Sequence, residues 1–343
     1  MSLRAKRSNQ SERNVPLRMG GIIFFLIVSL IAAIETGPTD ISVFQLLSGD
    51  ADEMSWTVVR DIRLPRLVLG AVVGAGLALA GAVLQAFFRN PLADPGLIGI
   101  SSGAALGAVI FLTTGAGLTF FAGTLGLSLS ALTGGIVATV GIYLLAKSDG
   151  QIRAVTFLLC GIAVNALIAS VMSYLIFLSD DRELRTVTFW LMGSLGFSTW
   201  KEVWAVLPLI LAALAAIPWL SKPLNLYILG ESEAAHLGVN VHLLKRWIII
   251  LCAAAVGASV AVSGMVGFVG LVVPHIVRLF ISADHRWLLP GSAILGAGLL
   301  IFSDLLARNL LAPVELPLGV ITAIFGAPFF LWLLFKERKR IFF

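Results

Sequence analysis

Residues 230–240 read GESEAAHLGVN, a short polar stretch between two long apolar runs at about 200–220 and 243–264. The polar and small residues of this stretch predict a short amphipathic helix in water. Each flanking run is close to the roughly 20 apolar residues that cross a bilayer as a helix. The stretch therefore predicts an all-α integral membrane protein with a water-exposed helix between two of its spans.

The composition of the whole chain agrees with a membrane protein. Its 343 residues are 58% hydrophobic and 13% charged, whereas about 25% of residues are charged in soluble domains. The apolar runs are long and do not alternate with a period of two, which favours helices over a β-barrel. Cys160 and Cys252 lie within apolar runs and indicate buried small side chains, not a disulfide.

The chain has ten apolar segments, and nine of them meet or approach the length of a membrane span. The eighth is short, and its sequence GFVGLVVP at 267–274 leaves a re-entrant segment open. Glycines four apart, as at Gly70 and Gly74 or Gly103 and Gly107, predict close packing of helices in lipid. The ten segments lie at about 20–36, 62–88, 97–114, 120–146, 153–178, 200–220, 243–264, 267–282, 287–311 and 316–335.

Basic residues at both ends of the chain predict the sidedness. Cytoplasmic segments next to spans are rich in Lys and Arg, so both termini are expected in the cytoplasm, which requires an even number of crossings. This predicts a basic cytoplasmic tail at 1–18, a single ten-helix domain at 19–336 and a cytoplasmic tail at 337–343. A cleavable signal peptide over the first run is the alternative. The basic residues are Arg4, Lys6, Arg7, Arg13 and Arg18, then Lys336, Arg338, Lys339 and Arg340.

Charged residues at the outer ends of two spans depart from this pattern. The second span begins with RDIRLPR at 60–66. Its arginines could extend to lipid headgroups or contact an acidic soluble partner, and the charges alone leave both open. Asp304 and Arg308 are four apart in the ninth span, which predicts an ion pair on one helix face.

No motif for bond chemistry stands out. The chain has no phosphate-binding P-loop and no H-E-x-x-H pair, and its histidines lack metal-ligand spacing. We therefore expect no catalytic residue, no metal site, no cofactor and no enzyme activity. An intramembrane serine protease would need Ser102 or Ser263 beside His275, a weak alternative. An ion-gradient-driven secondary transporter usually places ionisable residues at mid-membrane, where these spans are almost free of charge.

Seven stretches together resemble the FecCD family of permease subunits from ABC importers. They cover almost the whole chain in the family's order and leave only about the first 55 residues without a match. They are IRLPR at 62–66, LAGAVLQAFFRNPLADPGLIGISSGAALG at 79–107, TFWLMGSLG at 188–196, LGESEAAHLGV at 229–239, GFVGLVVPHIVRL at 267–279, DHRWLLPG at 284–291 and ELPLGVITAIFGAPFFLWLL at 315–334.

The resemblance implies ten transmembrane helices per subunit in a bacterial inner membrane. It implies that two copies of the chain form a central path, with two cytoplasmic ABC ATPase subunits below and a periplasmic binding protein above. Besides the lipid bilayer, no other partner and no nucleic acid is expected. Arg63, Arg66 and Arg308 match positions where relatives carry arginines that meet acidic residues of the binding protein. The cytoplasmic coupling helix, between the sixth and seventh spans, matches Gly230, Glu231, Ser232, Glu233, Ala234, Ala235, His236, Leu237 and Gly238.

The resemblance also implies the kind of cargo, a bulky iron chelate moved from periplasm to cytoplasm. Residues 180–185 leading into 188–196 look most like haem permeases, although ferric siderophores and cobalamin use the same scaffold. Met172 and Phe177 in the fifth span are candidates for lining the path. His275, beside Pro274, either touches the substrate or is a polar residue at a helix end.

Overall fold

The computed structural model describes residues 14–37, 41–114, 124–148 and 151–341. The predicted basic tail at 1–18 lies mostly outside these residues. Within them the chain is helical apart from a short antiparallel hairpin, in which β1 (Lys147–Ser148) pairs with β2 (Gln151–Ile152). The predicted helical class is therefore confirmed.

A helix occupies each of the ten predicted segments. Six helices are long and apolar enough to cross a membrane, or seven if α10 and α11 form one bent span. α6, α14 and the apolar part of α16 are shorter, so ten crossings remain a prediction. The helices are α2 (Val15–Glu35), α5 (Leu64–Phe87), α6 (Ile100–Thr113), α7 (Thr124–Ala146), α8 (Ala154–Leu178), α10 (Trp200–Ala215), α11 (Ile217–Tyr227), α13 (Val241–Ser263), α14 (Val269–Phe280), α15 (His285–Asn309) and α16 (Leu318–Ile341).

Several short helices lie outside the predicted segments. α9 begins with a capping box, in which Asp180 accepts from the Glu183 backbone N–H and the Glu183 side chain accepts from the Asp180 N–H. α4 and η1 continue into α5 and give one helical stretch of 35 residues. The short helices are α3 (Val43–Ser48), α4 (Glu53–Val58), the π-helical η1 (Val59–Arg63), the 3-10 helix η2 (Pro95–Ile98), α9 (Asp181–Leu191) and α12 (Glu231–His236).

The sixth predicted segment is longer than expected and is bent. It was predicted to end at about residue 220, but α11 continues to Tyr227. α10 and α11 meet at Ala216 with a bend of 51°. Pro218 lies in the first turn of α11, where a proline fits because its missing N–H has no helical acceptor there. The bend places the end of α11 beside α12.

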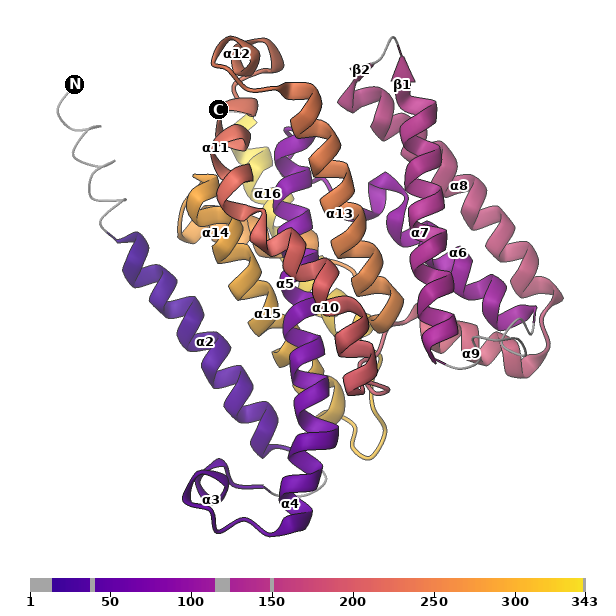
Figure 1. Cartoon of the computed structure of the whole chain (residues 1–343), viewed down its shortest axis with the longest axis vertical. Helices are drawn as coiled ribbons and strands as arrows, with labels where there is room; N and C mark the ends of the chain where they lie inside the picture. Colours follow the sequence, from indigo (N-terminus) through magenta and orange to yellow (C-terminus); the bar gives the residue numbers. More distant parts are fainter. Residues whose placement is uncertain (1–13, 38–40, 115–123, 149–150, 342–343) are drawn as a thin grey trace.

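α5 lies at the centre of the bundle, between α15, α14, α13 and α10 (Figure 1). Its packing depends on glycines. A Cβ atom on Gly74 would lie 2.3 Å from the backbone oxygen of Gly296 in α15, and one on Gly81 would lie 1.8 Å from that of Gly270 in α14. α6 and α7 pack in the same way, since a Cβ on Gly107 would lie 2.1 Å from the Ser130 oxygen. The predicted role of glycine in helix packing is confirmed at Gly74 and Gly107, and Gly81 adds a contact that was not predicted.

Gly81→Ala is expected to lower the free energy of unfolding by about 1–3 kcal/mol, the usual cost of overpacking, because α5 and α14 must separate. Gly141→Ala in α7 is the matched control, since nothing lies within 4 Å of its Cβ position. Denaturant unfolding in detergent measures both. Equal stabilities of the two variants would contradict the close contact.

Candidate functional site

α12 is the short polar helix that the sequence predicted, and it lies at one end of the molecule between α11 and α13 (Figure 1). Gly230, with a φ of 143°, precedes it, and Gly238, with a φ of 87°, follows it. Both values lie in the region that favours glycine. Ala234 is fully buried against the bundle, whereas Ser232, Glu233, Ala235 and His236 are exposed. α12 therefore presents a polar surface and rests on an apolar side.

One carboxylate anchors α12 to the bundle. Glu231 Oε2 lies 2.6 Å from Lys245 Nζ of α13, and the Tyr227 hydroxyl of α11 donates to Glu231 Oε1 at 2.9 Å. The Lys245 side chain is only 5% exposed, so its charge is neutralised at a largely desolvated position. α12 is thereby joined to two helices at once.

The anchor extends to the central helix. The Tyr227 ring stacks on Phe87 at the end of α5, with centroids 6.4 Å apart and planes 6° from parallel. The Arg89 guanidinium lies over the same ring at 5.8 Å. We call Glu231, Lys245, Tyr227 and Phe87 the α12 anchor. Lys245 and Tyr227 were not predicted as site residues. The four-residue spacing from Tyr227 to Glu231 indicates that these two can meet on one helical side, but no local pattern indicates Lys245.

The opposite end of the molecule carries a charge network that joins α5, α15 and the loop before α16. Arg66 Nη2 lies 2.9 Å from Asp304 Oδ1 and 2.8 Å from Glu315 Oε2. Arg308 Nε lies 3.2 Å from Asp304 Oδ2, so the predicted pair at four-residue spacing is confirmed. The hydrogen bond from Arg66 holds the pKa of Glu315, in the loop, below its ordinary value. We call Arg66, Asp304, Arg308 and Glu315 the outer network, after the side of the membrane on which the sequence predicts them.

The arginines are less available than the sequence suggested. The side chains of Arg66 and Arg308 are 12% and 9% exposed. Arg63 is buried and donates to the Ile34 backbone oxygen. Within the chain, Arg66 and Arg308 are paired with carboxylates, and no local sequence pattern around Arg66 indicates its contacts. Their docking role remains a prediction.

The candidate path residues do not form one site within this chain. Met172 and Phe177 lie on α8, on the side of the molecule opposite α14, which carries His275 (Figure 1). Phe177 is 83% exposed, whereas His275 is buried with its ring 6.3 Å from the Phe329 ring of α16. Among the described residues, no three His, Cys, Asp or Glu side chains are grouped to hold a metal ion.

The helical bundle around α5 matches a solved ABC-transporter structure in its fold. The solved structure titled an inward-facing conformation of a putative metal-chelate type ABC transporter superposes with a TM-score of 0.84 at 34% identity, covering 94% of this chain and 99% of that chain. The FecCD transport family matches residues 22–336, and the chain belongs to this family.

Proteins similar to this chain are named as permeases for two kinds of compound, hemin and cobalamin. The hemin transport system permease protein HmuU of Yersinia pestis is 41% identical over 324 residues, which cover 94% of this chain and 97% of that protein. The cobalamin import system permease protein BtuC of Halobacterium salinarum is 43% identical over 288 residues, covering 84% and 76%. The vitamin B12 permease BtuC of Salmonella typhi is 38% identical over 334 residues, covering 96% and 98%.

Proposed function

We propose that the chain is the membrane-spanning subunit of an ATP-driven importer for a bulky iron chelate, with haem as the first candidate. Two copies form the path, two ATPase subunits bind on the cytoplasmic side and a binding protein docks on the outer side. Residues 19–336 form one ten-span domain in a bacterial inner membrane, and the tails at 1–18 and 337–343 lie in the cytoplasm. The family membership and the 41% identity to a hemin permease support this proposal.

The α12 anchor is the observation that carries the mechanism. In the proposal, the polar face of residues 230–238 contacts the ATPase. When ATP brings the two ATPase subunits together, α12 moves with them. Because Glu231 is bonded to both α11 and α13, this motion is transmitted to the spans. The bundle then changes the side to which the path opens, provided that its contacts differ between the two states.

Replacing residues 231–236 by a Gly/Ser segment is expected to release the ATPase subunit during purification in detergent. The same replacement of α3 (Val43–Ser48), another six-residue helix, lies at the other end of the molecule and is the control (Figure 1). Co-purification of the ATPase with both variants would contradict the assignment of α12.

For docking, we propose the outer face around Arg63, Arg66 and Arg308. An acidic binding protein would there compete with Glu315, whose side chain is 46% exposed, for the Arg66 guanidinium. Glu315→Gln is expected to tighten docking about fivefold at low salt and less at high salt, since screening weakens exposed charge contacts. Titration of the binding protein measures this, and looser docking of the variant would contradict it.

For the path, we propose that Met172 and Phe177 face the central space between two copies, with His275 nearer its wall. The low burial of α8 supports this, because only 17% of the residues in its most apolar stretch are buried within the chain. Uptake of haem, a ferric siderophore and cobalamin by the complete reconstituted complex tests the whole proposal. We expect haem uptake with ATP. Uptake driven by a proton gradient without ATP would identify a secondary transporter instead.

A further inference from the structure

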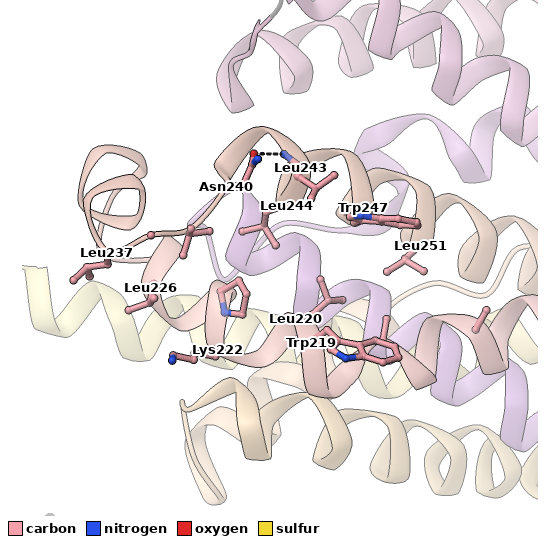
Figure 2. A pocket seen from close by; sticks show the side chains of 15 residues that line it. Trp219, Leu220, Lys222, Leu226, Leu237, Asn240, Leu243, Leu244, Trp247 and Leu251 are labelled. Atoms are coloured by element: carbon pink, nitrogen blue, oxygen red, sulfur yellow. Dashed lines mark hydrogen bonds between the residues drawn. The ribbon is translucent and has the colours of Figure 1, made fainter.

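A groove of about 740 Å³ runs between the bent pair α10–α11 and α13 (Figure 2). Fifteen residues line it, and Lys222 is the only charged one among them. Trp219 and Trp247 line it from opposite walls. They are 74% and 50% exposed, so the groove opens to the surroundings of the chain along two apolar helices.

The length of the groove fits one leaflet of a bilayer. Its α13 wall extends from Asn240 to Leu251, which at 1.5 Å per residue is roughly 16 Å. Half of the hydrocarbon core of a bilayer is about 15 Å thick. Tryptophans are enriched where hydrocarbon meets the headgroups. The dimensions therefore suit one acyl chain.

The polar groups lie at one end of the groove. Lys222 is exposed and forms no ion pair or hydrogen bond in the described part of the chain. Asn240 Oδ1 accepts from the Leu243 N–H at 3.0 Å, which leaves the Asn240 amide Nδ2 as a donor (Figure 2). By contrast, the charge of Lys245 in α13 is neutralised by Glu231. The groove thus has an unpaired cation and an amide donor at one end and an apolar channel along its length. These features are complementary to a lipid that has an anionic headgroup and an acyl chain.

We propose that this groove binds one anionic phospholipid. Its phosphate lies at Lys222 and Asn240, and one acyl chain lies between Trp219 and Trp247. The lipid also contacts Leu237 to Asn240, which line the groove and connect α12 to α13. This site is independent of the transported cargo, and its test does not require transport.

The test uses the full-length chain in phosphatidylcholine nanodiscs that contain a small fraction of brominated-chain lipid, which quenches nearby tryptophans. The chain has eight tryptophans. We expect brominated phosphatidylglycerol to quench more than brominated phosphatidylcholine at the same fraction. The excess should disappear in the double variant Trp219→Phe with Trp247→Phe. Equal quenching by the two lipids, or an excess that persists in the double variant, would overturn the proposal.

Lys222→Gln is expected to weaken the phosphatidylglycerol excess about fivefold, the effect of one basic residue at an anionic membrane surface. Lys201→Gln is the matched control, because Lys201 is exposed at the other end of the same bent pair and does not line the groove. An unchanged excess in Lys222→Gln would refute the site. A changed dimer fraction in that variant would show that a second copy covers the groove, and would refute it too.

Filling the channel provides a second pair of variants. Ala212 lines the groove near its apolar end, whereas Ala215 is also exposed on α10 but does not line it. Ala212→Phe should reduce quenching of Trp219 and Trp247 by the bound chain, and Ala215→Phe should not. The same quenching in both variants would show that no acyl chain occupies the groove.

Discussion

Asp304→Asn is expected to lower the free energy of unfolding by about 3–5 kcal/mol, the cost of breaking a buried ion pair on one side. Asp304 is shared by Arg66 and Arg308, and its side chain is only 5% exposed. The variant keeps the shape of the side chain and removes its charge. Arg66 keeps its ion pair with Glu315. Arg308 loses the carboxylate of its ion pair and remains near the guanidinium of Arg66. Denaturant unfolding in detergent measures the loss.

Two further variants make this result specific. Asp61→Asn removes an exposed carboxylate at the same end of the molecule and should change stability little. Adding Arg308→Met to Asp304→Asn should recover part of the loss, because it removes the uncompensated charge. A stability of Asp304→Asn equal to that of Asp61→Asn would mean that the outer network does not stabilise the bundle.

Glu231→Arg is expected to reduce uptake by the complete complex at least tenfold, while ATP hydrolysis continues. The substitution places a second cation beside Lys245, whose side chain is 5% exposed. It also removes the acceptor of the Tyr227 hydroxyl. Loss of hydrogen bonds to a charged group costs about 1.5–3 kcal/mol, enough to separate α12 from α13. Parallel assays of uptake and ATP hydrolysis by the reconstituted complex measure the effect.

Reversing the pair is the decisive control. Glu231→Lys combined with Lys245→Glu restores opposite charges across the same contact and should recover part of the uptake. Glu233→Arg makes the same charge change on an exposed residue of α12 and should leave the stability of the chain unchanged. If Glu231→Arg transports at the wild-type rate, the α12 anchor has no part in coupling.

The sequence predicted the helices well because long apolar runs have few other ways to satisfy their backbone groups in lipid. It also predicted the pair of Asp304 and Arg308, since residues four apart on a helix are neighbours. It did not predict the 51° bend at Ala216 or the extension of α11 to Tyr227. Prolines occur in several of these helices, and their positions in the sequence do not tell which proline accompanies a bend.

Contacts between distant segments of the chain could not be predicted from its sequence. Arg66 and Asp304 are 238 positions apart, and their contact depends on the rotation of α5 against α15. That rotation is set by glycine contacts such as Gly74 with Gly296, which no charge pattern indicates. The arginines near the end of the second span therefore left their partners open, whereas the fold pairs Arg66 with Asp304 and Glu315.

The position of α5 couples the two ends of the molecule, where the binding protein and the ATPase are proposed to bind. Arg66 lies in its first turn and Phe87 is its last residue, so about 32 Å of one helix separates the outer network from the α12 anchor. In the proposed importer, a displacement at either end of the molecule moves the same helix, α5. Thermodynamic reciprocity then requires that whatever ATP binding does to the affinity for the binding protein, the binding protein does equally to the affinity for ATP.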